Sequence, residues 1–175
     1  LVSDPRFGDH DAGAWHPERP ARLGATLDGV HDAHLGDDLI RVQPSAAPLS
    51  ALTAVHDPGL VALLESLDDL GGGAIDGDTS MNAASWEAAQ LAAGAGLTAV
   101  AALDRGDADA AFCAVRPPGH HATPVRSMGF CLLNNAAVTA RALADRGERV
   151  LIVDYDAHHG NGTQDAFYDD GRVLF

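Results

Sequence analysis

The residues best suited to chemistry lie in the segment VLIVDYDAHHGNG, residues 150–162. An apolar run leads directly into Asp154, Asp156 and His158, and alternate side chains of an extended chain project to the same side. Two carboxylates about 6.6 Å apart repel each other by roughly 2.5 kcal/mol at an effective dielectric of about 20, so burying them requires a cation or a proton. Carboxylates and imidazole without thiolates suit a divalent ion such as zinc. We therefore predict a metal site here, the alternative being a solvated loop with incidental histidines.

A second polar segment, RPPGHHA at residues 116–122, follows another apolar run. The prolines must end a strand and stiffen the loop, which places His120 and His121 at its edge. Adjacent histidines cannot point the same way, so we interpret them as a general base and its partner in proton transfer; the alternative is a surface pair. With a metal that lowers the pKa of bound water from about 16 towards 7, the two segments predict a mononuclear metal hydrolase.

Three further stretches are weak when taken alone. Gly129 and Phe130 could line a narrow channel, although a buried aromatic residue before a helix is the commoner case. The Asp76-Gly77-Asp78 loop and the HPERP segment at residues 16–20 have no specific pattern. The chain lacks a nucleophile elbow, a phosphate-binding loop and a dinucleotide fingerprint, which favours hydrolysis over phosphoryl or hydride transfer.

Strands and helices that alternate along the chain should position these residues. The apolar pattern predicts four main helices, at residues 17–31, 59–70, 83–103 and 135–145. Strands are expected at 39–42, 110–115, 149–153 and 173–175, those at 110–115 and 149–153 being wholly apolar and thus buried on both faces, and 71–78 is expected to be a loop. This order indicates βαβ units in one domain, with a mostly parallel sheet between helices and ligands at the carboxyl ends of its strands.

Composition restricts the possible partners. The chain has 175 residues, 46% of them hydrophobic and 21% charged, which excludes a disordered chain. Its 25 acids against 11 basic residues, all arginine, give a net charge of -14, which disfavours nucleic acid. No membrane span, signal peptide or disulfide framework is present, so we expect a soluble, cytoplasmic protein. Adaptation to salt and a GC-rich genome explain the acidic, lysine-free composition equally well.

These motifs together resemble the histone deacetylase family, which has the α/β arginase–deacetylase fold: three αβα layers around a mostly parallel sheet. The resemblance extends over nearly the whole chain and rests on HPERPARL, RPPGHHA, MGFCLLNNAAV and VDYDAHHGNGTQDAFYDDGRVLF. It is greatest for the class II branch, which includes prokaryotic acetylpolyamine amidohydrolases. The resemblance implies a zinc-dependent deacetylase that releases acetate from acetyl-lysine or acetylpolyamine substrates.

The resemblance also assigns roles to individual residues. Asp156 and His158 match two zinc ligands, and His121 matches the histidine that acts on the catalytic water. His120 pairs with Asp154, and Asn161 stands behind His121. A monovalent cation, K⁺ for example, is implied at Asp154, Asp156, His158 and Phe167. The substrate channel is implied at Gly129, Phe130 and Asp78.

The family takes its third zinc ligand and its carbonyl-polarising residue from loops beyond position 175. We therefore expect residues 1–175 to be the N-terminal part of one deacetylase-like domain, with little activity alone.

Two alternatives stay open. One is a ureohydrolase of the same fold with two manganese ions, against which Gly160 after His159 argues. The other is a degenerate or acyl-binding protein without catalysis. The acyl substrate, the choice of zinc or iron and the oligomeric state are left undetermined.

Overall fold

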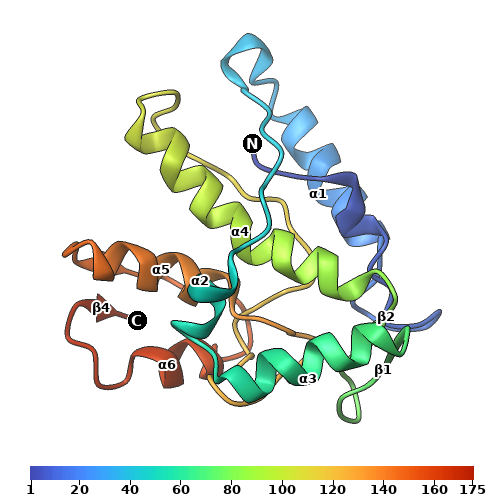
Figure 1. Ribbon diagram of the computed structural model, residues 1–175. Coiled ribbons are helices and arrows are strands. Elements are labelled where there is room, and N and C mark those ends of the chain that lie inside the picture. Colours follow the sequence, from blue (N-terminus) through green and yellow to red (C-terminus); the bar gives the residue numbers. More distant parts are fainter.

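The structure, a computed structural model, describes all 175 residues except the side chain of Asp37. Its helical elements are η1 (Pro5–Gly8), α1 (Ala21–Asp32), η2 (Gly36–Asp38), α2 (Leu49–Thr53), α3 (Pro58–Asp69), α4 (Ser85–Asp104), α5 (Asn135–Asp145) and α6 (Asn161–Phe167). Its strands are β1 (Gly72–Ala74), β2 (Ser80–Asn82), β3 (Val150–Leu151) and β4 (Val173–Leu174). Figure 1 shows α4 crossing the centre of the molecule, with α1, α3 and α5 around it. Within the residues described, no helix is long and apolar enough to cross a membrane.

The four main predicted helices are confirmed, and local signals explain their ends. The Asp57 carboxylate accepts a hydrogen bond from the Gly59 N–H at the start of α3, and Asn134 caps α5 by accepting from the Ala137 N–H. The first helix begins at Ala21 rather than at residue 17. Arg19 precedes a proline, which disfavours helical backbone at that position.

Helix α4 is the structural centre because it is apolar on nearly every side. Its buried residues include Trp86, Leu91 and a series of alanines. Small residues let its neighbours approach closely: a Cβ on Gly96 would collide with the Thr139 side chain of α5, and one on Gly94 with the Ser45 carbonyl. The main core cluster therefore forms where α4 meets α2, α3, α5 and the segment before α5.

The predicted parallel sheet is only partly formed. Strands β3 and β4 pair in parallel, with Val150 opposite Val173. Val2 forms single parallel bridges to Val42 and Cys113, so the predicted strands at 39–42 and 110–115 are reduced to one bridge each. The predicted loop at 71–78 instead begins the antiparallel hairpin β1–β2. Gly72 makes this possible, since its φ is +112° and a Cβ there would collide with the backbone of Met81.

The prediction that two strands are buried on both faces is wrong. Val150 and Ile152 face the cluster formed by α5 and α6, whereas Leu151 and Val153 on the opposite face are exposed, Val153 by 72%. Phe112 in the other segment is also half-exposed. A strand is buried on both faces only when helices cover both, and within the described residues helices cover one face of β3.

Candidate active site

The adjacent histidines are each held by a different polar partner. The Nδ1–H group of His120 donates to Asp154 Oδ2 at 2.8 Å, and that of His121 donates to Asn161 Oδ1 at 2.6 Å. The two ring centroids lie 4.1 Å apart. Each acceptor fixes one tautomer, so Nε2 of both rings is left free to exchange a proton. The structure therefore brings together four of the residues that the sequence singled out.

The loop after β3 is bent rather than extended, which corrects the expected alternation of its side chains. The Asp156 N–H donates to Asp154 Oδ1 at 3.0 Å, and the His158 N–H donates to Asp156 Oδ1 at 2.8 Å. Short aspartate side chains form such turns readily with the backbone two residues further on. The turns bring Asp156 Oδ1 within 3.1 Å of His158 Nδ1, so the two predicted metal ligands lie side by side.

The two carboxylates of this loop are held in the ionised form. Partial burial would raise the pKa of Asp154, but hydrogen bonds from the Asp156 N–H and from His120 hold that pKa below its ordinary value. Hydrogen bonds from the backbone and ring of His158 lower the pKa of Asp156. Both groups are thus available as anionic oxygen donors.

Asp156 and His158 have the right chemistry for zinc, but two donors are fewer than a catalytic zinc site uses. Their side chains are 50% and 79% exposed, so both can reach a metal from solvent. Among the described residues, no group of three histidine, cysteine, aspartate or glutamate side chains could hold a metal ion. Since a catalytic site takes three protein ligands, this donor set fits zinc in kind and is incomplete in number.

A cavity of about 510 Å³ opens beside these groups. Its lining consists of Pro17, Glu18, Arg22, Asp78, Pro118, His120, His121, Gly129, Phe130, Asp156 and His158. Gly129 has a φ of +57°, and a Cβ there would come within 2.6 Å of the His121 ring, so only glycine lets this wall approach the base. Phe130 and Gly129 therefore do line the cavity, which overturns their interpretation as ordinary core residues.

Asp78 lies at the same cavity and is tied to its wall through His16. His16 Nδ1 accepts from the Glu18 N–H at 3.1 Å, and its Nε2–H donates to the Asp78 carbonyl at 3.0 Å. The His16 ring also meets the Phe130 ring edge-on, with centroids 4.5 Å apart. The Phe130 N–H in turn donates to Thr79 Oγ1 at 3.0 Å. The HPERP segment thus joins the rim loop to the wall of the cavity.

Sequence reasoning missed the buried ion-pair network behind the histidine loop. The Arg116 guanidinium donates to both oxygens of Glu18 at 2.6 Å, and to the backbone carbonyls of Phe7 and His10. Burial alone would raise the pKa of Glu18, but hydrogen bonds from His10 and Arg116 hold it at about 2. In the sequence, the network is visible only as Glu18 within HPERP and Arg116 before PPGHH. Neither residue shows by its local pattern that the other is its partner, so only the fold brings them together.

The side chains of two other residues near these motifs are buried away from the proposed chemistry. Burial raises the pKa of Cys131 to about 12, so its thiol stays protonated near His121 and is no nucleophile at neutral pH. Phe167 is buried with residues of α5 and β4, and the Arg141 guanidinium lies 5.0 Å from its ring centroid. The Phe167 side chain is therefore part of the core, and the predicted place of this residue in a cation site stays a prediction.

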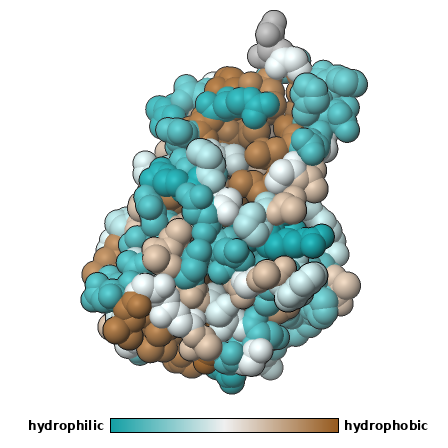
Figure 2. Space-filling view, turned by 90° about the vertical axis from the view of Figure 1, so that its right-hand side faces the viewer, coloured by the Kyte–Doolittle hydropathy of each residue, from teal (hydrophilic) through white to brown (hydrophobic). Residues whose placement is uncertain are grey.

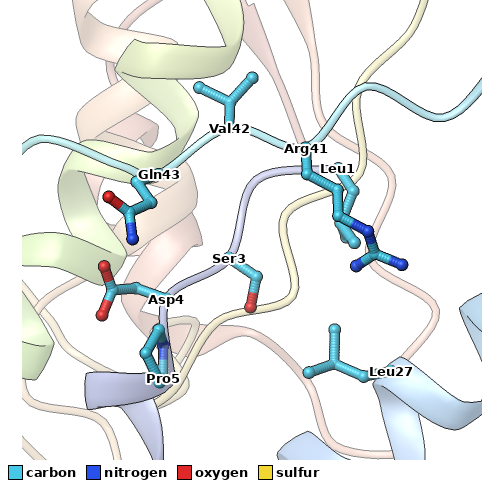
Figure 3. A pocket seen from close by; sticks show the side chains of 8 residues that line it. All are labelled: Leu1, Ser3, Asp4, Pro5, Leu27, Arg41, Val42 and Gln43. Carbon is cyan, nitrogen blue, oxygen red and sulfur yellow. The ribbon is translucent and has the colours of Figure 1, made fainter.

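A different cavity, of about 270 Å³, lies between the N-terminal segment and α1. Its lining includes Leu1, Leu27 and Val42, and Figure 3 shows Arg41 and Leu27 on opposite sides of the space between α1 and the N-terminal segment. Asp4, the acid among its lining residues, is already paired with Arg6 at 2.8 Å. In the view of Figure 2, apolar surface gathers near the top of the molecule and is bordered by polar residues. None of the predicted site residues lines this cavity, so it is not the candidate site.

Comparison with known proteins agrees with the motifs. Residues 16–175 match the family model of the histone deacetylase domain. The chain is 40% identical to a probable deacetylase of Archaeoglobus fulgidus, covering 100% of this chain and 49% of that protein. It is 38% identical to a histone deacetylase-like amidohydrolase of Pseudomonas aeruginosa, over 99% of this chain and 44% of the relative.

A solved structure shows the same arrangement. The HDA15 HD domain superposes with a TM-score of 0.92 at 36% identity, covering 99% of this chain and 50% of that one. The chain thus spans about half the length of the relatives named here. It belongs to the histone deacetylase family, and its described residues form part of the α/β arginase–deacetylase fold.

Proposed function

We propose that this chain contributes the proton-transfer half of a metal-dependent amidohydrolase, which removes acetyl groups from N-acetylated amines. The observation that carries the proposal is the pair His120 and His121, one backed by a carboxylate and one by an amide, at a cavity that also exposes Asp156 and His158. Family membership supports hydrolysis of an acetyl amide as the reaction class.

The different partners of the two histidines suggest different roles. Asn161 fixes the tautomer of His121 without adding charge, so Nε2 of His121 can take a proton from water that attacks the acetyl carbonyl. Asp154 behind His120 stabilises a positive charge on that ring. We assign His121 as the general base and His120 as the partner that would carry positive charge beside the developing anion. Gly129 and Phe130 would hold the acyl chain against His121.

Asp156 and His158 would hold the metal ion, with a third ligand from outside the described residues. When bound, zinc would supply a Lewis acid that polarises the substrate carbonyl. We also propose a monovalent-cation site at Asp154, Asp156, His158 and Phe167, to which Phe167 could contribute only its backbone carbonyl because its side chain lies in the core. The turns tie the first three of these residues to one another through the Asp154 and Asp156 carboxylates, and a cation would offset the repulsion between the two carboxylates.

We further propose that residues 1–175 are the N-terminal part of one deacetylase-like domain. The bare apolar face formed by Leu151, Val153 and Leu174 supports this, because a parallel sheet in this fold class is covered on both faces. The incomplete metal donor set supports it as well. A cytoplasmic location stays a prediction.

The test is acetate release from acetyl-lysine and acetylpolyamine substrates, with and without zinc. A protein carrying this chain together with the remainder of the family domain should show metal-dependent release, and this chain alone little or none. His121→Ala should reduce kcat by about 10²- to 10⁴-fold, the usual contribution of a general base. His31→Ala, on the exposed last turn of α1, is the matched control and should leave kcat unchanged.

Two outcomes would contradict the proposal. Acetate release that does not depend on metal would remove the assigned role of Asp156 and His158. Two metal ions per site by elemental analysis, with activity on a guanidino substrate, would favour the ureohydrolase alternative instead.

A further inference from the structure

The side chain of Asn161 has two possible orientations that differ in their chemistry. Its amide ends in an oxygen and an NH₂ group of similar size, and a half-turn about the Cβ–Cγ bond exchanges them. With the oxygen facing the ring, as in this structure, His121 keeps its proton on Nδ1 and leaves Nε2 free. With the NH₂ group facing the ring, Nδ1 would have to accept a hydrogen bond and the proton would move to Nε2. The orientation of this amide therefore decides whether Nε2 of His121 can take up a proton.

The backbone of Asn161 is fixed, but it leaves the amide free to turn. The Asn161 N–H donates to the His159 carbonyl at 2.9 Å, and the N–H groups of Gly162 and Thr163 donate to the His120 carbonyl at 2.9 and 3.2 Å. These bonds hold the start of α6 against the histidine loop. None of them involves the side chain of Asn161, so its orientation depends on what the amide itself contacts.

Met128 contacts the side of the amide that faces away from His121. The NH₂ group of Asn161 donates from Nδ2 to Met128 Sδ at 3.7 Å. Within the described chain, the hydrogen bonds of the Asn161 amide are this one and the one to His121. A thioether sulfur can accept a hydrogen bond but cannot donate one, so it favours the NH₂ group as its neighbour over the oxygen. The sulfur thus favours the orientation that leaves Nε2 of His121 free.

Met128 is itself held in place by a tight turn. Met128 and Cys131 exchange two backbone hydrogen bonds, of 3.1 and 3.0 Å. Gly129 and Phe130 between them have φ values of +57° and +70°, and two positive φ values in succession are typical of the type I′ turn of a hairpin. A second cavity, of about 590 Å³, is lined by both Met128 and Asn161. The sulfur is therefore presented to the amide from a fixed backbone.

We propose that Met128 is a positioning residue, which selects the orientation of the Asn161 amide and thereby the tautomer of His121. The proposal rests on the proposed function, because the selected tautomer matters for a base that acts through Nε2. Methionine often serves as an adaptable apolar filler, a role that leucine could share. Here the sulfur adds a preference that leucine lacks.

Nitrogen-15 NMR of the neutral His121 ring distinguishes the two tautomers and tests the proposal on the chain itself, without catalysis. In the native chain the proton should reside mainly on Nδ1. Met128→Leu keeps an apolar side chain of similar volume but removes the acceptor. It should lower the ratio of the Nδ1–H to the Nε2–H form about two- to tenfold, the effect of losing one neutral hydrogen bond.

Two further variants make the result decisive. Met81→Leu makes the same change in the main core cluster and should leave the tautomer ratio of His121 unchanged. Asn161→Asp presents an oxygen to the ring in either orientation, so adding Met128→Leu to it should not change the ratio. A purely structural role of Met128 would give the same shift in both backgrounds. Circular dichroism would confirm that all variants fold.

The outcomes separate this inference from the proposed function. If Met128→Leu leaves the tautomer ratio unchanged, or if its effect persists in the Asn161→Asp background, Met128 does not select the amide orientation. The assignment of His121 as the base then stands, provided that the native ring carries its proton on Nδ1. A native neutral ring that carries its proton on Nε2 would overturn both the role of Met128 and that of His121.

Discussion

The two sides of the candidate site are built very differently. The histidine loop rests on the buried network of Arg116 and Glu18, and its rings are held by Asp154 and Asn161. The loop with Asp156 and His158 is exposed and follows a short strand with one bare apolar face. This chain therefore fixes the proposed bases by its own packing, but holds the proposed metal ligands only through turns within one loop.

The two sides differ because the histidine side contains charged groups that are buried away from water, whereas the charged groups of the ligand side are exposed. A buried ion pair that loses one partner leaves an uncompensated charge in the interior, so the histidine side depends on a few residues. Exposed groups on the ligand side can turn to water at little cost. Substitutions on the two sides should consequently differ strongly in their effects.

The largest effect is expected from Glu18→Ala. It would leave the guanidinium of Arg116 buried without its carboxylate, and should lower the free energy of unfolding by about 3–5 kcal/mol. Urea unfolding followed by circular dichroism measures it. Arg105→Ala breaks an exposed pair with Asp107 and is the control, with an expected change of about 0.5 kcal/mol or less. If both variants lost a similar free energy of unfolding, the buried pair would not be the feature that stabilises the histidine side.

Acid should weaken the same network. The pKa of Glu18 is about 2 in the fold and about 4.3 when unfolded, so its contribution to stability is complete above pH 4.5. That contribution is lost as pH falls from 4.5 towards 2, because the unfolded chain takes up the proton first. Unfolding measured across this range should show a smaller acid loss in Glu18→Gln than in the native chain.

A smaller but more local effect is expected from Gly162→Ala. The added methyl would collide with the backbone of Ala122 and lie 2.7 Å from the carbonyl carbon of His121. Overpacking of this kind costs about 1–3 kcal/mol, and it should displace the histidine loop. Hydrogen exchange at the His121 amide should speed up more than exchange in α4. Gly29→Ala in α1 has open space for its methyl, and should be neutral or stabilising.

His56 gives the histidine side a sensitivity to pH near neutrality. Its Nδ1–H donates to the Thr123 carbonyl and its Nε2 accepts from the Asn134 N–H, which requires a neutral ring. Burial lowers the pKa of His56, so stability is complete above about 6.5 and falls as pH drops below it, since the unfolded chain binds the proton. Urea unfolding at pH 7.5 and 5.5 should show this fall. A fall of the same size in His56→Gln would contradict the assignment.

The smallest effect on stability belongs to the ligand side. Asp156→Asn and His158→Ala should each change the free energy of unfolding by about 0.5 kcal/mol or less, because both groups are exposed. Zinc titration by calorimetry should show weak binding in the native chain and none in either variant. A loss of several kcal/mol would mean that this loop is part of the core.

Sequence reasoning succeeded where a single segment carries its own signal. The capped, apolar-periodic helices α3 and α5 were predictable, as was the pairing of His120 with Asp154 and of His121 with Asn161 from the family motifs. It failed for the strands. An apolar run shows that a segment can be buried, but the layer that covers it is formed by other segments of the chain. Val153 is exposed because no such layer lies over it among the described residues.

The sequence by itself determined the helices, the family and the residues that we propose carry the chemistry, because these depend on residue types at short spacings. Only the tertiary structure decided that Glu18 lies against Arg116, 98 positions away, and that His16 joins Asp78 to Phe130. It also decided that the two predicted ligands meet in a bent loop without a third donor among the described residues. Such contacts arise from the packing of distant segments, which no local pattern records.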